Sequence, residues 1–441
     1  KQAEPPWYGP VCPVVWEGSG REAAPYPDWT PMAFRFLQPC PSVTVSLEVL
    51  VQLLCRRYDS GEPVRLGIAD GRIDAVTACE PEDRGSRSLP WIAPGLMDIQ
   101  FNGYGGQEFS SADLTPEKFV RIVRNTNAFG VTRFCPTLTT ERFEVLAHAL
   151  RTIAEACESS AEVSQRVAGI HLEGPYLSTE DGARGAHPQE YCRLPDLDEF
   201  QRLQEAAGGR IRILTMAVEF DRSPAFVQRV AQSGVVVAIG HTAANSTQIR
   251  AAVDAGARMS THLGNGSHAV LPRHDNYLWD QLAEDRLVAG LIADGHHLPP
   301  PVLKTFVRAK TPHRCILVSD IAGQAGLPPG RYPGDLCDVE ILPGGRLVVA
   351  GQTEMMAGAS LPIGTGVANV MHFAGVSLRQ AVEMAVHHPA VLLGIEPGCL
   401  APGHRADLVL FDLIRSSEPQ QPPGFEVRAT LIAGEVVFGA V

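Results

Sequence analysis

The stretch Val235-Val-Val-Ala-Ile-Gly-His241 carries the pattern that decides the fold. It is a short apolar run, rich in β-branched residues, that ends in a histidine. A segment of helical period, 246–255, separates it from a second apolar run at 258–263. Such runs are typical of strands buried on both faces of a parallel sheet. The stretch therefore predicts a strand, a helix and a second parallel strand.

The same alternation extends in both directions along the 441 residues. Further apolar runs occur near 93–102, 131–137, 167–173, 211–219, 288–294 and 315–320, and helical segments occur at 116–127, 141–157 and 224–232. Eight such units in about 230 residues are what a (β/α)8 TIM-like barrel needs. The connection 264–287 is more loop-like. A hairpin insertion at 339–350 and helical stretches at 360–373 and 377–387 follow the eighth run.

The two ends of the chain have a different character. The segment 63–76 reads as a hairpin with its turn at Asp70-Gly71, and 406–412 and 427–438 are also strand-like. We expect a small β-sandwich domain formed by the N- and C-terminal segments. The predicted division is an unassigned segment 1–55, the small β domain 56–92 plus 395–441, and the barrel 93–394.

Composition excludes several classes of function. The formal net charge is -12, which disfavours general binding of nucleic acid or of anionic membranes. The ten cysteines are scattered without a CxxC pair, as expected for free thiols in a reducing compartment, so we predict a cytoplasmic protein. The apolar-rich stretch 43–55 is interrupted by polar residues and is too short to span a bilayer. A small molecule remains as the class of substrate that is compatible with this composition.

Polar residues stand where the predicted strands end, which is where barrel enzymes place their chemistry. One histidine at a strand end is usually a structural group, but here Glu173, His241, His262 and Asp320 share one layer. Two imidazoles and a carboxylate suit a catalytic divalent metal with one open position. Zn2+ fits best, and Fe2+ or Co2+ also suit these ligands. A further carboxylate, Asp320, could move protons as general base and acid.

These residues lie in recognisable sequence motifs. In chain order they are Ile92-Ala-Pro-Gly-Leu-Met-Asp98, His171-Leu-Glu-Gly-Pro175 with Arg184-Gly-Ala-His187-Pro, Gly240-His-Thr242, Thr261-His-Leu-Gly-Asn265, Leu291-Ile-Ala-Asp-Gly-His-His297, Val318-Ser-Asp320, Met356-Ala-Gly-Ala-Ser360, His388-Pro-Ala-Val-Leu-Leu-Gly394 and Gly403-His-Arg-Ala-Asp-Leu408. From about 56 to 440, the chain resembles a divergent member of the N-acetylglucosamine-6-phosphate deacetylase family, within the amidohydrolase superfamily.

The resemblance implies a role for each matching position. Glu173, His241 and His262 would hold the metal, Asp320 would be the general base and then the general acid, and His297 would assist catalysis and bind substrate. The remaining substrate-binding positions would be Ala186, Asn265, Gly266, Arg273, Asp294, Met356, Ala357 and Gly358. The resemblance also implies a homodimer whose neighbouring subunit contributes to the phosphate site.

The chain departs from the family's pattern in two informative places. Many amidohydrolases carry His-X-His on the first strand, whereas Gln100 and Asn102 stand here, so we predict one metal ion per subunit. The loop after Thr261-His-Leu also differs from the usual sequence of the family. Within this loop, Arg273 could bind a phosphate bidentately or be a surface residue.

The predicted reaction is hydrolysis of the N-acetyl group of N-acetylglucosamine 6-phosphate. The alternative within this chemistry is another N-acyl or cyclic amide substrate, such as an unphosphorylated N-acetyl amino sugar. Outside it, a barrel isomerase acting on sugar phosphates would hold no stoichiometric metal. A binding protein without activity would have no need for the four residues Glu173, His241, His262 and Asp320.

Overall fold

The computed structural model describes residues 51–79, 89–334, 337–418 and 420–441, and the account below concerns these residues. The unassigned segment 1–55 therefore lies outside the described residues, except that Val51–Arg57 forms strand β1. None of the described helices combines the length and the apolar character needed to cross a bilayer.

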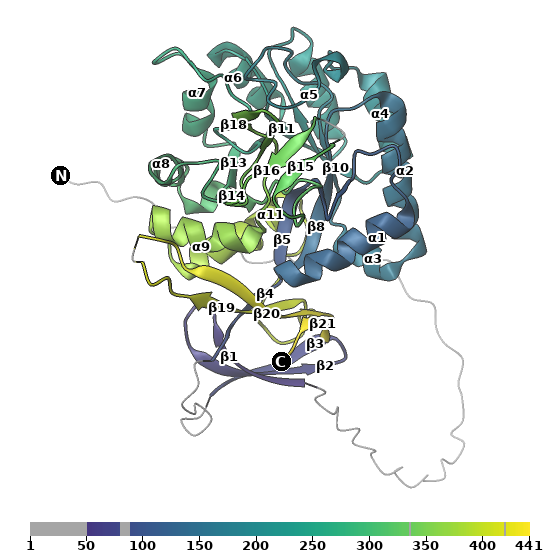
Figure 1. The fold of residues 1–441 in the computed structure, drawn as a ribbon. Helices are drawn as coiled ribbons and strands as arrows, with labels where there is room; N and C mark the ends of the chain where they lie inside the picture. Colours follow the sequence, from purple (N-terminus) through teal and green to yellow (C-terminus); the bar gives the residue numbers. More distant parts are fainter. Residues whose placement is uncertain (1–50, 80–88, 335–336, 419) are drawn as a thin grey trace, which may run out of the picture. The chain divides into compact units, whose positions relative to one another are not determined.

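Eight parallel strands form the predicted barrel (Figure 1). In chain order they are β5 (Leu96–Phe101), β8 (Val131–Leu138), β9 (Ile170–Glu173), β10 (Ile211–Met216), β11 (Val236–Ile239), β12 (Met259–Ser260), β13 (Val288–Ile292) and β14 (Cys315–Val318). Each strand pairs with the next, and the last meets the first through an Asp320 N–H that donates to the Gln100 carbonyl at 3.0 Å. The (β/α)8 prediction is confirmed.

Helices surround the strands and bury their apolar faces against them. They are α1 (Pro116–Asn125), α2 (Phe143–Ser159), α3 (Ala161–Arg166), α4 (Leu197–Ala206), α5 (Ser223–Gln232), α6 (Ser246–Ala255), α7 (Tyr277–Ala283), α8 (Pro300–Lys310), α9 (Ile363–Ala374), α10 (Leu378–Ala385) and α11 (His387–Leu392). Local sequence sets their limits. Helix α6, for example, begins at a capping box in which Asn245 and Gln248 satisfy each other's backbone N–H groups. The loop-like connection 264–287 contains one short helix, α7.

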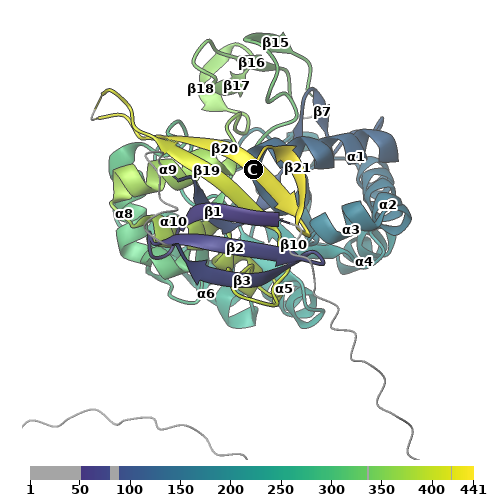
Figure 2. The same cartoon turned by 90° about the horizontal axis from the view of Figure 1, so that it is seen from below.

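A seven-stranded sheet lies beyond one end of the barrel and is built from both ends of the described chain (Figure 2). Its order is β21-β20-β19-β4-β1-β2-β3, with β2 (Pro63–Ala69), β3 (Arg72–Ala78), β4 (Trp91–Pro94), β19 (Leu408–Ile414), β20 (Gly424–Ile432) and β21 (Glu435–Gly439). The predicted hairpin turns at Asp70 and Gly71, both with positive φ, as a two-residue hairpin loop requires. Leu66, Leu408 and Leu431 belong to its own apolar core.

A four-stranded antiparallel sheet follows the eighth barrel strand, where the sequence predicts only a hairpin. The insertion sheet consists of β15 (Gly330–Tyr332), β16 (Val339–Ile341), β17 (Leu347–Val349) and β18 (Gln352–Met356). The predicted hairpin corresponds to β16 and β17. A further two-stranded ribbon, β6 (Gly103–Tyr104) with β7 (Gln107–Glu108), follows the first barrel strand.

Candidate metal centre and active site

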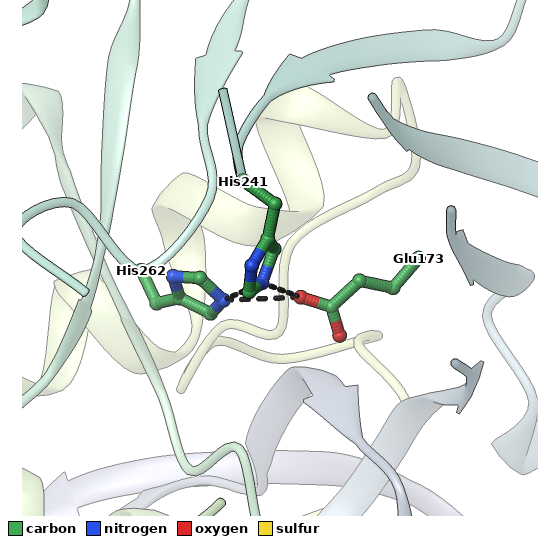
Figure 3. A group of neighbouring side chains, drawn as sticks. All are labelled: Glu173, His241 and His262. Atoms are coloured by element: carbon green, nitrogen blue, oxygen red, sulfur yellow. Dashed lines mark hydrogen bonds and ion pairs between the residues drawn. The ribbon is translucent and has the colours of Figure 1, made fainter. Parts of the chain in front are cut away.

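Three buried side chains from different strands converge at the carboxyl end of the barrel (Figure 3). Glu173 is the last residue of β9, while His241 and His262 each follow two residues after the ends of β11 and β12. The two Nε2 atoms are 3.0 Å apart, and they lie 3.2 Å (His241) and 3.0 Å (His262) from Oε1 of Glu173. The predicted meeting of these side chains is therefore present.

The backbone at this layer is held in a conformation that side-chain-bearing residues rarely adopt. His241, His262 and Asp320 have φ values of 50°, 26° and 53°, in the left-handed region. Strained backbone of this kind persists where the surrounding structure enforces it, and it clusters at functional sites. The turn that follows each strand thus directs a polar side chain back over the barrel axis.

Nδ1 of His241 is hydrogen-bonded, and this leaves Nε2 as the nitrogen that can bind a metal. Nδ1 lies 3.2 Å from the Ala183 carbonyl and can donate to it, which leaves the Nε2 lone pair facing Glu173 and His262. Burial opposes ionisation of Glu173, yet hydrogen bonds and charge from His241 and His262 hold its pKa well below the usual value. Without a proton or a cation between them, two imidazole lone pairs and a carboxylate at this spacing would repel one another. The residues therefore fit a divalent metal ion.

Asp320 lies beside this group, two residues after the end of β14. Its Oδ1 accepts hydrogen bonds from the side-chain amides of Gln100 at 3.0 Å and Asn102 at 2.9 Å. Burial, together with the negative charge of Glu173, raises the pKa of Asp320. A carboxyl group with a raised pKa is the better proton acceptor near neutral pH.

The residues that replace His-X-His serve the two carboxylates. Besides its bond to Asp320, the Gln100 amide nitrogen donates to both carboxylate oxygens of Glu173, at 3.1 and 3.2 Å. Each side chain thus turns its NH2 group toward the carboxylates and its oxygen away. This arrangement agrees with their predicted unsuitability as metal ligands.

A cavity of about 790 Å³ opens above the centre. Several residues predicted from the sequence to bind substrate line it: Ala186, Asn265, Gly266, His297, Met356, Ala357 and Gly358. Gly266 is needed for close approach, because a Cβ there would lie 2.6 Å from Nδ1 of His241. The structure thus brings most of the predicted substrate residues around one space.

Two predicted substrate residues lie elsewhere. Asp294 is behind His297, and its carboxylate accepts from the backbone N–H and lies 2.8 Å from Nδ1 of that histidine. It therefore positions the imidazole. Arg273 is exposed on the loop before α7 and does not line the cavity of the single chain.

One further residue of the cavity, His187, was not assigned a role from the sequence. It is buried, its ring packs edge-on against His241 with centroids 4.4 Å apart, and its Nδ1 has no partner among the described residues. Burial and the neighbouring histidines lower its pKa to about 3, so the ring is neutral. The motif Arg184-Gly-Ala-His187-Pro contains this histidine, but the rule that site residues follow strand ends could not identify it, because it lies in a loop.

Comparison with known proteins agrees with this geometry. The sequence profile of the Amidohydrolase family matches residues 91–437. N-acetylglucosamine-6-phosphate deacetylase from Bos taurus is 37% identical over 360 residues, covering 79% of this chain and 83% of that protein. The enzyme of the same name from Homo sapiens is 36% identical over 410 residues, covering 88% and 95%.

A solved structure is similar over nearly the same span. It is a mutant N-acetyl-D-glucosamine-6-phosphate deacetylase from Mycobacterium smegmatis in complex with N-acetyl-D-glucosamine-6-phosphate. It superimposes with a TM-score of 0.76 at 30% identity, covering 88% of this chain and 99% of that one. The chain belongs to the amidohydrolase family and, within it, to the N-acetylglucosamine-6-phosphate deacetylase family.

Proposed function

We propose that this protein hydrolyses the N-acetyl group of N-acetylglucosamine 6-phosphate, giving glucosamine 6-phosphate and acetate. The observation that carries the proposal is the meeting of Glu173, His241 and His262 beside Asp320 in one cavity. The relatives that cover most of this chain bear the name of this activity.

We further propose that Glu173, His241 and His262 hold one divalent ion per subunit, with Zn2+ the ion that this donor set suits best. When bound, such an ion lowers the pKa of a water molecule and polarises the acetyl carbonyl. The side-chain amide nitrogen of Gln100 donates to both Glu173 and Asp320 and so holds the two carboxylates in place.

Asp320 moves the proton in this mechanism. Its carboxylate removes a proton from the attacking water, and the hydroxide then adds to the acetyl carbon to give a tetrahedral intermediate. Asp320 returns the proton to the sugar nitrogen, the C–N bond breaks, and acetate and the free amine leave. Because Asn102 and Gln100 both donate to Oδ1, the second oxygen, Oδ2, remains available for this transfer.

Two of the histidines that line the cavity, His297 and His187, can stabilise the intermediate. Asp294 holds His297 through Nδ1, so Nε2 is the nitrogen left to face substrate. The neutral His187 beside His241 offers a second polar group to the developing oxyanion. Asn265, Gly266 and the segment 356–358 then enclose the sugar.

The deciding experiment is acetate release on metal-defined protein. N-acetylglucosamine and its 6-phosphate are compared at equal concentrations, with N-acetylgalactosamine 6-phosphate as an epimeric control, and bound metal is counted in parallel. We expect one metal ion per chain and a strong preference for N-acetylglucosamine 6-phosphate. Equal rates with and without the phosphate would favour the unphosphorylated amino sugar, and absence of stoichiometric metal would overturn the mechanism.

We also propose a homodimer, in which Arg273 reaches the phosphate site of the neighbouring subunit. Its exposure on a loop beside the cavity residues 264–267 supports this arrangement. We expect the protein to act in the cytoplasm, since the described cysteines are free thiols, most of them buried. Light scattering and cell fractionation test these two points.

A further inference from the structure

Two loops at the carboxyl end of the barrel form neighbouring parts of the cavity wall. The β9 loop, residues 174–188, contributes Ala186, and the β12 loop, residues 263–276, contributes Asn265 and Gly266. They come from strands that are far apart in the sequence, so no short stretch of chain fixes the distance between them. That distance decides how closely the cavity can fit a ligand.

The imidazole of the candidate metal ligand His241 lies between these two loops. A Cβ at Gly185 in the β9 loop would be 3.1 Å from its Cε1, and a Cβ at Gly266 in the β12 loop would be 2.6 Å from its Nδ1. The Ala183 carbonyl of the β9 loop lies 3.2 Å from the same Nδ1. Movement of either loop would therefore change the surroundings of His241 and the shape of the sugar site together.

One residue of the β12 loop, His268, joins the two loops. Its Nε2 lies 3.2 Å from Oε2 of Glu180 in the β9 loop, and its Nδ1 lies 2.9 Å from the hydroxyl of Tyr277, the first residue of α7. The backbones also meet there, because a Cβ at Gly182 would lie 2.8 Å from Cα of His268. No role was assigned to His268 from the sequence, because it follows no strand end.

The hydrogen bonds of this group show which nitrogen of His268 carries the proton. The backbone N–H of His268 donates to the Tyr277 oxygen at 2.8 Å, so the phenol hydrogen can point at Nδ1. Burial raises the pKa of Tyr277, and the phenol therefore keeps that hydrogen. Because Nδ1 accepts, the imidazole proton is on Nε2, which donates to Glu180. The three side chains form one chain of hydrogen bonds from α7 to the β9 loop.

Both ends of this chain are connected to the rest of the site. Tyr277 is only 5% exposed and packs in the barrel core, so it is a fixed anchor. At the other end, the Glu180 carbonyl accepts from the N–H of Arg184 at 2.9 Å. The Arg184 guanidinium in turn donates to the carbonyl of the cavity residue His187 at 2.6 Å. The position of the β9 loop over the cavity thus depends on contacts that begin at Tyr277.

We propose that His268 is a positioning residue, which holds the β9 and β12 loops at the spacing that the sugar site requires. This inference rests on the proposed function. His268 does not line the cavity of the described chain, so it acts through the loops rather than on the substrate. Its effect falls on substrate binding, and proton transfer stays with Asp320.

The test compares four variants of the metal-loaded protein. His268→Ala removes the imidazole, His268→Gln keeps an N–H donor near the place of Nε2, and Tyr277→Phe removes only the hydroxyl. His404→Ala is the matched control, because His404 also faces a surface carboxylate, that of Glu396 at 3.6 Å, and lies outside the cavity. The values of kcat and KM for N-acetylglucosamine 6-phosphate are measured, together with bound metal and amide hydrogen exchange in the two loops.

We expect His268→Ala to raise KM by roughly 3- to 30-fold, the range that one or two lost hydrogen bonds produce. The values of kcat and of bound metal should stay near those of the wild type, and exchange should become faster in both loops. His268→Gln should recover part of the loss, and His404→Ala should match the wild type. Adding Tyr277→Phe to His268→Ala should cost little more, because both changes break the same chain of hydrogen bonds.

Three results would overturn the inference. A wild-type KM and unchanged exchange in His268→Ala would show that the loops keep their spacing without the imidazole. Fully additive effects of His268→Ala and Tyr277→Phe would show that the two residues act separately. Loss of bound metal or of folded protein in both His268→Ala and His268→Gln would make His268 a structural residue.

Failure of the proposed function would look different. A metal-loaded wild type that releases no acetate from N-acetylglucosamine 6-phosphate would refute that function. The hydrogen-exchange comparison of the wild type with His268→Ala would still test whether His268 holds the two loops, because it needs no substrate.

Discussion

Buried charged side chains occur in two regions of this molecule, and they are satisfied in different ways. In the outer layer, the ammonium of Lys310 donates to the carbonyls of Glu284 and Leu287 at 2.7 and 2.8 Å. Arg166 likewise donates to the carbonyl of Val131, and also to the side-chain oxygens of Thr126 and Asn127. These groups hold loops and strand ends in place through neutral partners.

At the mouth of the barrel, the buried polar groups face one another instead. Glu173 contacts His241 and His262, while Asp320 receives the side-chain amides of Gln100 and Asn102. Polar atoms remain unpaired there, among them Nδ1 of His187 and of His262. Burial of charge alone therefore does not identify a site in this fold. The difference is that the titratable side chains Glu173, His241 and His262 contact one another at the barrel mouth, whereas Lys310 and Arg166 bond to groups that do not titrate.

The largest expected effect comes from removing the metal. Chelation should reduce acetate release to the background rate and lower the unfolding temperature, because Glu173, His241 and His262 are left buried without a shared cation. Added Zn2+ should restore both. His262→Asn should lose stoichiometric metal, whereas His372→Gln, on an exposed helical position, should retain it. Full activity in the chelated protein would show that the buried group Glu173, His241 and His262 is not a catalytic metal site.

The next effect is that of the proton carrier. We expect Asp320→Asn to lower kcat by about 10²- to 10⁴-fold, since general acid–base catalysis contributes on that order. Bound metal should stay at the wild-type level, because Asp320 is not needed as a ligand. Near-wild-type turnover in a metal-loaded Asp320→Asn protein would remove Asp320 from the mechanism.

The smallest effect concerns the outer layer and pH. Burial lowers the pKa of Lys310 from 10.5 to about 8. Between these two pH values the unfolded chain binds more protons than the folded one, so this lysine should make the protein more stable as pH rises from about 8 toward 10.

Lys310→Met should remove this rise, which amounts to at most about 1.4 kcal/mol per pH unit. Its activity, measured at pH 7.5, should follow only the amount of folded protein. Denaturant unfolding of the two proteins at several pH values between 7.5 and 9.5 checks the slope. Parallel curves would mean that Lys310 stays charged when folded.

The sequence predicted the barrel because its strands and helices leave periodic traces. The run 235–241 contains β11, and the helical segment 246–255 corresponds to α6. The bounds of α6 agree with the prediction. Glu173, His241, His262 and Asp320 were predicted to meet by one rule, that parallel strands present their carboxyl ends to a common face. The rule works because chain topology alone brings those ends together.

What the sequence could not supply lies in loops. His187 reaches the cavity from a loop without periodicity, so no pattern in the chain places it there. The positive φ of His241 cannot be read from residue type, since histidine seldom adopts it. Nor could the spacing show that the amide of Gln100 joins Glu173 to Asp320. Such contacts depend on side-chain directions that only the folded chain fixes.

The seven-stranded sheet has a consequence for the order of synthesis. Strand β4, near residue 91, pairs with β19, so that Ile92 of β4 is opposite Leu410 of β19. The ribosome makes the whole barrel between these partners, so the edge of β4 stays unpaired until β19 has emerged. A chain that stops before Leu408 would contain Glu173, His241, His262 and Asp320, yet expose the apolar face around Leu66. Completion of the seven-stranded sheet thus depends on strands β19 to β21, which follow the residues of the candidate site in the chain.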